Sequence, residues 1–292
     1  MAFSQLRPLS FGEILDGAFT IYRRQFASLF LTALIPQLPV IAWTGLYALV
    51  LAGIGGGMPG SSTYSPGTGV LIAFAVLTLP AIVGGLTAVG GVTYQFSRAY
   101  TGQPVTTGDA LKRGLRCSAP LFAAYALVGI MAMFGLLAFL IGFFVVLLAS
   151  FAVAPAVVLE RRGPVEGISR SWQLIKGAWG EVFLVVFVAS LIAGLPASAV
   201  SGTVAIFGMI ASHGDPGQAA AYQAAGQVLG GLLRTLTIPF SLGTTVLLYY
   251  DRRVRTEALD VQMMAESLSV PAAPYGAPAP YAETPAPAPR WG

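Results

Sequence analysis

The chain has 292 residues, of which 55% are hydrophobic and only 10% are charged, with a formal net charge of +4. Soluble domains contain about 25% charged residues, so this composition excludes an ordinary water-soluble domain and indicates an integral membrane protein. The net positive charge is concentrated in short segments, which anionic lipid head groups explain more simply than nucleic acid does.

The basic residues follow a strict distribution along the chain. Fifteen of the sixteen Lys and Arg residues lie before residue 25, between 98 and 116, between 161 and 176, or after 251. The hydrophobic runs between these segments occur in pairs, and the turn within each pair contains no Lys or Arg. Cytoplasmic connectors of membrane proteins carry such an excess of basic residues. The pattern predicts that every basic connector and both termini face the cytoplasm.

Each hydrophobic run is long enough to cross a bilayer core, which needs roughly 20 helical residues. The run 119–159 is uncharged throughout, is about twice as long as one span needs, and has basic residues on both sides. It must therefore cross an even number of times. We expect a tight hairpin there, turning near 135–142, and an external loop over 211–226. The six predicted spans are 27–53, 70–97, the two halves of 119–159, 181–210 and 226–250.

A short amphipathic segment precedes each predicted hairpin, near 10–26, 106–118 and 163–178. Ser10 with Glu13, and Thr106 with Asp109, match the pattern in which a cap residue is followed three positions later by an acidic residue. In the third segment, Pro164 stands at the first helical position. These residues predict three helix starts.

Aromatic residues recur at helical spacing in the first and third of these segments. When the first is aligned on the third without a gap, Phe19 pairs with Trp172 and Phe26 with Trp179. The chain is therefore predicted to repeat an amphipathic helix and a hairpin three times, with a weaker middle copy. Such helices lie in the membrane interface, where we expect Phe19, Tyr22, Phe26, Trp172 and Trp179 to anchor them. The alternative is that they are soluble connectors between spans.

Three stretches with these features resemble one known family: RPLSFGEILDGAFTIYRRQF, VAPAVVLERRGPVEGISRSWQLIKGAWG and LLYYDRRVRTEALD. From about residue 6 to 268 the chain is similar to the glycerophosphoryl diester phosphodiesterase membrane domain family of prokaryotic six-span proteins. The resemblance implies an all-α integral membrane domain over 1–268 in the cytoplasmic membrane of a prokaryote. Some members join this domain to a catalytic barrel, for which the segment after 268 is too short. The Pro- and Ala-rich segment 269–292 is predicted to be a disordered cytoplasmic tail.

The polar residues give little support for catalysis. Metal-assisted phosphodiester hydrolysis needs clustered carboxylates and histidines, whereas the chain has a single histidine, His213, near Asp215. No glycine cluster is followed by the Lys and Ser or Thr of a phosphate-binding loop. We therefore expect no enzymatic activity, no catalytic residue, no metal site and no cofactor.

The most suggestive single residue is Arg234, which lies inside the sixth predicted span. A charge at the centre of a bilayer costs about 3 kcal/mol on insertion scales, and it normally faces a bundle interior or a watery cavity. Arg234 is therefore a candidate contact for an anion or a lipid head group. The alternatives are a structural bond to helix carbonyls or to Gln37, and snorkelling of the side chain toward the interface.

Two main functional hypotheses follow. In the first, the protein is a non-catalytic scaffold or regulatory component that organises lipids or partner proteins at its basic cytoplasmic face. In the second, it is a transporter or channel for a small or lipidic anion, using Arg234 and helices kinked by the span prolines Pro36, Pro39, Pro80, Pro155, Pro196 and Pro239.

A third hypothesis, implied by the resemblance, is a membrane module accessory to glycerophosphodiester metabolism. The expected partners are membrane lipids, including anionic head groups; a protein partner or a second copy of the chain is left open, and nucleic acid is not expected. A cavity lined by Arg234 would favour transport. A solid bundle with a flat exposed apolar face would favour the scaffold.

Overall fold

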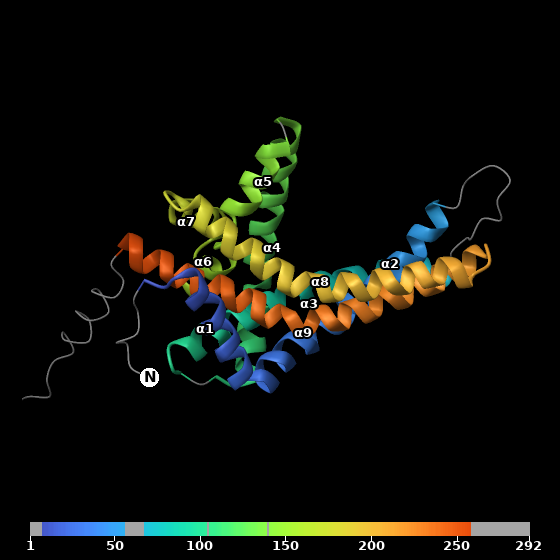
Figure 1. Ribbon diagram of the computed structural model, residues 1–292, viewed down its shortest axis with the longest axis horizontal. Helices are drawn as coiled ribbons and strands as arrows, with labels where there is room; N and C mark the ends of the chain where they lie inside the picture. The colour runs from blue at the N-terminus through green and yellow to red at the C-terminus, as the bar shows by residue number, and fades with distance from the viewer. Residues whose placement is uncertain (1–7, 56–66, 104, 139, 258–292) are drawn as a thin grey trace, which may run out of the picture.

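The computed structural model describes residues 8–55, 67–103, 105–138 and 140–257, and these ranges contain nine helices and no strand (Figure 1). The helices are α1 Phe11–Arg24, α2 Phe26–Gly55, α3 Thr68–Tyr100, α4 Thr107–Ala138, α5 Leu140–Ala149, α6 Val153–Leu159, α7 Pro164–Ile175, α8 Trp179–Ala211 and α9 Pro216–Glu257. Within these ranges, six segments are long and apolar enough to cross a membrane: Phe26–Leu51, Thr68–Tyr100, Thr107–Leu137, Leu140–Leu159, Trp179–Ala211 and Pro216–Glu257. The predicted all-α, six-span membrane fold is confirmed.

The three predicted helix starts are found where their cap residues stand. The Glu13 carboxylate accepts a hydrogen bond from the Ser10 backbone N–H at 2.8 Å, and Ser10 Oγ accepts from the Glu13 N–H at 3.4 Å. Thr106 Oγ1 accepts from the Asp109 N–H at 3.2 Å at the start of α4. The third helix, α7, begins at Pro164. These bonds occupy backbone donors that have no partner inside the helix, which is why the helices begin there.

The first and third repeats align in sequence as predicted. α1 begins at Phe11 and α7 at Pro164, and the long helices that follow begin at Phe26 and Trp179, so one and the same shift relates both pairs. The middle copy differs from the prediction, because 106–118 is not a separate helix but the first part of α4. A Cβ on Gly114 would lie 2.3 Å from the Thr87 carbonyl oxygen. Gly114 therefore lets α4 pack closely on α3 instead of ending the helix.

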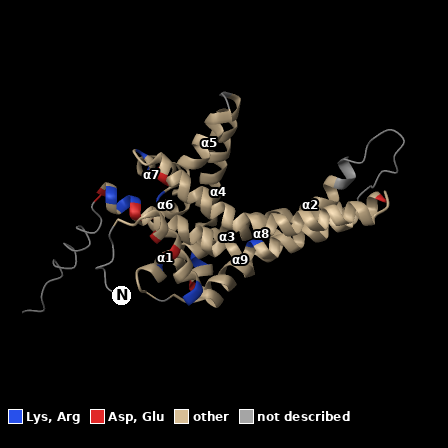
Figure 2. Ribbon diagram, in the orientation of Figure 1, with Lys and Arg blue, Asp and Glu red and all other residues tan. Residues whose placement is uncertain are grey.

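The helices form two arms that diverge from a common base (Figure 1). α2, α3, α8 and α9 lie side by side in the longer arm, and the α4–α5 hairpin is the second arm, attached through α3. α1, α6 and α7 lie where the arms meet, and we call this region the base. Most Lys, Arg, Asp and Glu residues gather around the base (Figure 2).

Large clusters of buried side chains also lie at the base. Its largest buried cluster joins α1, α3, α8 and α9 through fully buried side chains such as Ile14, Phe96, Val185 and Leu247. Farther along the arms, large apolar side chains are exposed, as at Leu137 of α4, which is 76% exposed. Such an apolar surface suits contact with lipid chains rather than with water.

The hairpin predicted near 135–142 is confirmed. α4 ends at Ala138 and α5 begins at Leu140. A Cβ on Gly135 would lie 2.7 Å from the Gly142 carbonyl carbon, so the two helices approach at backbone distance. Only a residue without a side chain permits this contact.

The external loop predicted over 211–226 was wrong. α8 ends at Ala211 and α9 already begins at Pro216, so that only 212–215 forms the turn. His213, with φ 47°, and its neighbouring glycine adopt the left-handed conformation that reverses the chain there.

Two local features explain the longer helix. Asp215 Oδ1 accepts a hydrogen bond from the Gly217 N–H at 2.8 Å, which is an N-cap, and Pro216 occupies the first helical position. A Cβ on Gly226 would lie 2.9 Å from the Ser201 carbonyl oxygen, so this weakly hydrophobic stretch packs closely on α8. The predicted tail 269–292 lies outside the described residues, as do residues 56–66 between α2 and α3.

Candidate functional site

A cavity of about 1010 Å³ lies between the helices of the two arms. Five helices, α2, α3, α4, α8 and α9, contribute to its wall. The residues that line it include Gln37, Ile82, Leu86, Val89, Phe122, Tyr125, Ala126, Ser190, Gln227, Arg234 and Ser241.

Arg234 lies in this cavity, near the middle of α9. It stands farther from the start of its helix than predicted, because α9 begins already at Pro216. Its side chain is exposed and lines the cavity. Among the described residues, its guanidinium forms no hydrogen bond or ion pair, although Gln37 lines the same cavity. The structural bond to Gln37 or to helix carbonyls is therefore not present.

Polar side chains extend along the cavity face of α9 on both sides of Arg234. Gln227, Arg234 and Ser241 follow one another at a regular interval, which is close to two helical turns, so they share one face over about 21 Å. We call these three residues the polar ladder. The side chains of Gln227, Ser241 and Gln37 form no hydrogen bond with another described residue. Sequence analysis missed Gln227 and Ser241, and their spacing from Arg234 was the available signal.

The wall that α3 and α4 contribute to the cavity is largely apolar. It is built by Ile82, Leu86 and Val89 of α3 and by Phe122 of α4. The lining contains no Asp, Glu, His or Cys within the described part of the chain, so Arg234 has no counter-charge there. The cavity therefore combines a cation and hydrogen-bonding groups on α9 and α2 with a largely apolar wall on α3 and α4.

No site for a metal ion is found in the ranges that the structure describes. No three His, Cys, Asp or Glu side chains gather there closely enough to hold one. His213 and Asp215 lie in the turn between α8 and α9 and do not line the cavity.

The predicted anchors of α1 divide between protein and surface. The apolar face of α1 packs on the base through Ile14 and Ala18, which are fully buried. The Tyr22 hydroxyl donates a hydrogen bond to the Leu236 carbonyl of α9 at 2.6 Å, and burial raises the pKa of Tyr22 to about 12. Tyr22 thus ties α1 to α9, whereas Phe19 and Phe26 remain exposed.

The two tryptophans of the third repeat differ in the same way. Their rings meet edge to face, with centroids 6.4 Å apart. Trp172 packs against two buried clusters, and its indole Nε1 is buried without a hydrogen-bond partner among the described residues. Trp179 is 38% exposed. Membrane anchoring by Phe19, Phe26 and Trp179 stays a prediction, while Tyr22 and Trp172 also pack inside the protein.

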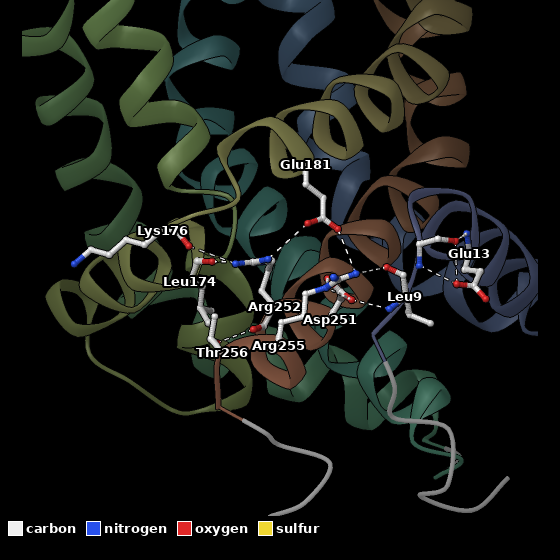
Figure 3. Close-up of polar contacts among 10 residues, drawn as sticks. Leu9, Glu13, Leu174, Lys176, Glu181, Asp251, Arg252, Arg255 and Thr256 are labelled. Atoms are coloured by element: carbon white, nitrogen blue, oxygen red, sulfur yellow. Dashed lines mark hydrogen bonds and ion pairs between the residues drawn. The ribbon is translucent and has the colours of Figure 1, made fainter.

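An arginine from the end of α9 joins the third repeat to the base (Figure 3). Arg252 donates from Nε to the Leu174 carbonyl at 3.1 Å and from its terminal nitrogen to the Lys176 carbonyl at 3.4 Å. It also lies 3.6 Å from the Glu181 carboxylate in the first turn of α8. Arg252 therefore satisfies carbonyls at the end of α7 and holds the start of α8.

A second arginine of α9 binds the segment before α1 (Figure 3). Arg255 donates to Asp251 at 2.9 Å and to the Leu9 carbonyl at 2.7 Å, and Asp251 accepts from the Leu9 N–H at 2.7 Å. Arg255 also lies 3.5 Å from Glu181. We call Arg252, Arg255, Asp251, Glu181 and Leu9 the base clamp, because together they tie both ends of the chain's membrane domain to α7 and α8.

Glu160, directly after α6, is the centre of a further network at the base. It accepts hydrogen bonds from Tyr249, Arg162 and, at 3.0 Å, Arg170, and Arg253 lies 3.7 Å away. Burial raises the pKa of Glu160, but the hydrogen bonds from Tyr249 and Arg162 and the charge of Arg170 outweigh it and hold this pKa below its ordinary value. Glu160 is therefore an anion at neutral pH that connects α6, α7 and α9.

Comparisons with known proteins add no relative. The chain matches no protein-family model, no curated protein and no solved structure. Its class therefore follows from the fold and the site: an all-α, six-span membrane protein with a cavity that carries a cation on α9 and is largely apolar on α3 and α4.

Proposed function

We propose that this protein binds an anion within the membrane, in the cavity that Arg234 lines, and carries it as a transporter. The observation that supports this most strongly is the guanidinium itself, which faces the cavity without a partner among the described residues. A cation in the hydrocarbon region costs about 3 kcal/mol on insertion scales. An arginine that fills no structural role needs a compensating interaction, and a bound anion supplies it.

The chemistry of the site fits an anion with several oxygens. The planar guanidinium binds phosphate and carboxylate groups through two parallel hydrogen bonds. The carboxamides of Gln37 and Gln227 add neutral donors in the same cavity. No carboxylate lines the described cavity wall, so none competes with the ligand for Arg234.

Snorkelling explains this arginine less well. From Pro216 to Arg234, α9 rises about 27 Å. This distance far exceeds the reach of one side chain, and beyond Arg234 the helix continues to Glu257. A side chain that faces a cavity this far from the outer end of its helix is better placed to bind a ligand there than to reach the external interface.

The orientation is part of the same proposal. The base carries most of the basic residues, whereas the turn 212–215 carries none, and basic residues favour the cytoplasmic side. We therefore propose that the base and both termini are cytoplasmic, in the cytoplasmic membrane of a prokaryote. The resemblance to the glycerophosphoryl diester phosphodiesterase membrane domain family supports this location.

The scaffold hypothesis is the second candidate. It is favoured by basic side chains that remain exposed, Arg23 and Arg24 at the end of α1 and Lys112 and Arg116 on α4. Anionic lipid head groups or an acidic partner protein could bind them without any transport. In that case the Arg234 cavity would have no ligand of its own.

We also propose that the protein has no enzymatic activity, although it could serve glycerophosphodiester metabolism by moving a phosphate-bearing substrate. Purified protein incubated with glycerophosphodiesters and divalent metals is expected to release no glycerol phosphate. Turnover that persists in pure protein and disappears in a His213→Ala variant would contradict this.

Ligand-induced stabilisation tests the anion site. Protein in neutral detergent would be heated with inorganic phosphate, with glycerol phosphate, with phosphatidylglycerol or with phosphatidylcholine, and unfolding followed by tryptophan fluorescence. A ligand at 100 times its Kd stabilises the folded state by about 2.7 kcal/mol. At least one anion should raise the unfolding midpoint in the wild type and in the control Arg24→Gln, but not in Arg234→Gln. An equal response in Arg234→Gln, or no response to any anion, would refute the proposal.

A further inference from the structure

We infer that the anion is a membrane lipid that enters the cavity sideways from the bilayer, between α4 and α8, with its head group at Arg234 and its chains along the apolar wall. This inference rests on the proposed function, because it specifies the ligand of the same site. Three observations carry it: the two-sided lining of the cavity, its open side and its size.

The lining is two-sided in the way that an amphiphile requires. The polar ladder and Gln37 lie on α9 and α2, whereas Ile82, Leu86 and Phe122 lie on α3 and α4. A small inorganic anion would gain nothing from the second wall. A lipid binds the polar groups and the apolar wall together. Its head group accepts hydrogen bonds from Arg234, and its chains contact the apolar side chains.

The cavity is open toward the lipid. Phe122 and Tyr125 of α4 line the cavity, yet they are 53% and 38% exposed. α4 and α8 both contribute to the wall but do not pack along each other, because the α4–α5 hairpin diverges from the longer arm (Figure 1). In a bilayer, an opening between two spanning helices faces the acyl chains. A lipid can therefore enter without leaving the membrane.

The size of the cavity agrees with this ligand. Its volume of about 1010 Å³ is at the upper end of the range of about 300 to 1,000 Å³ found for sites of drug-sized molecules. A lone phosphate-sized ion would fill a small part of it. A head group with the first part of its chains fills much more, and the rest of each chain can extend through the opening.

The polar ladder gives the head group partners along its path. Gln227, Arg234 and Ser241 offer unpaired side-chain donors over about 21 Å of α9. A head group that leaves the interface can therefore exchange one partner for the next. On the base side of the ladder the path ends, because Val185 and Leu247 belong to the tightly packed core. In this conformation the cavity accepts a lipid without connecting to the base.

The experiment separates the lipid from a soluble anion by changing the opening without touching the head-group site. Ala126 is exposed, lines the cavity on α4 and lies beside the opening, so Ala126→Trp narrows the way in. Ala199 is exposed on α8 and does not line the cavity, and Ala199→Trp is the matched control. The probes are phosphatidylglycerol added to protein in neutral detergent and soluble glycerol phosphate, with binding measured by native mass spectrometry and by thermal shift.

We expect phosphatidylglycerol to bind the wild type and Ala199→Trp equally, and to bind Arg234→Gln about 10- to 100-fold more weakly. Ala126→Trp should also weaken lipid binding by about tenfold or more, while its unfolding midpoint without ligand stays close to that of Ala199→Trp. If glycerol phosphate binds through Arg234 and phosphatidylglycerol does not, or if Ala126→Trp leaves lipid binding unchanged, the lipid inference is refuted and the anion site stands. If neither probe binds in an Arg234-dependent way, both are refuted.

Discussion

Replacing Arg252 by methionine tests whether the base clamp holds the third repeat together. The side chain is 8% exposed and connects three places: the Leu174 and Lys176 carbonyls at the end of α7 and the Glu181 carboxylate at the start of α8. Methionine keeps most of the volume of the side chain but cannot donate a hydrogen bond. The Leu174 and Lys176 carbonyls then have no charged donor, and no helical bond replaces it, because the last carbonyls of a helix have no partner within the helix.

The expected loss can be worked from these contacts. A hydrogen bond from a charged group contributes about 1.5 to 3 kcal/mol, and the bond at 3.4 Å to Lys176 is weaker than the bond at 3.1 Å to Leu174. The pair with Glu181, at 3.6 Å and on a partly exposed carboxylate, adds at most about 1 kcal/mol, since Arg255 remains beside it. We therefore expect Arg252→Met to lower the free energy of unfolding by about 2 to 4 kcal/mol.

Thermal unfolding in detergent measures the effect. Arg24→Met, at an exposed position on α1, is the matched control and should change the midpoint little. Arg252→Lys should fall between the two, because lysine keeps the charge near Glu181 but lacks the fork that reaches two carbonyls. An Arg252→Met variant as stable as the control would refute the reasoning and show that the clamp contributes no stability.

Three further predictions concern the base, the packing of the arms and the topology. The folded-state pKa of Glu160 lies below its ordinary value, so its contribution to stability is present above that value and is lost as pH falls through the folded pKa. Glu160→Gln should therefore unfold at a lower temperature than the wild type at neutral pH, and this difference should shrink in acid. A difference in unfolding temperature that does not depend on pH would contradict this. A Cβ on Gly84 would lie 2.1 Å from a carbonyl oxygen of α2, whereas one on Gly85 would make an ordinary contact at 3.8 Å. Gly84→Ala should therefore lower the free energy of unfolding by about 1 to 3 kcal/mol, and Gly85→Ala should not lower it. Equal unfolding midpoints of the two variants would contradict this and show that α2 shifts at little cost. In a Cys117→Ser background, an impermeant thiol reagent added to intact cells should label Gln223→Cys and not Lys112→Cys, both exposed positions, and the reverse pattern would overturn the proposed orientation.

The family resemblance remains a proposal. It was drawn from three short stretches, and they lie at the base: the first contains Ser10 and Glu13, the second Glu160 and Arg170, and the third Asp251 and Arg252 to Arg255. These residues build caps, the clamp and the Glu160 network. The stretches therefore describe how the base is held together, and they contain no residue of the Arg234 cavity.

Some expectations failed where tertiary contacts overrode local patterns. The stretch before Gly226 has few large apolar residues, and it was predicted to be an external loop. It is helical because Asp215 caps it and α8 packs against it. The amphipathic helices α1 and α7 also pack into the base through buried residues such as Ile14 and Ile175, and the contact of their exposed aromatic residues with lipid stays a prediction. Hydrophobic spacing shows that a face is covered without showing what covers it.

The sequence alone determined the class of the protein, the number of spans, the hairpin within 135–142 and the three helix starts. These properties depend on local chemistry: the length of an apolar run, a cap residue and its partner three positions later, or a pair of glycines at a tight crossing. The sequence also marked Arg234, because a charge inside a span is costly wherever it stands. Only the tertiary structure decided what surrounds this arginine. Gln37 and Arg234 lie far apart in the sequence and meet the apolar side chains of α3 and α4 only because the two arms diverge from one base, and that arrangement is set by helix packing over the whole domain.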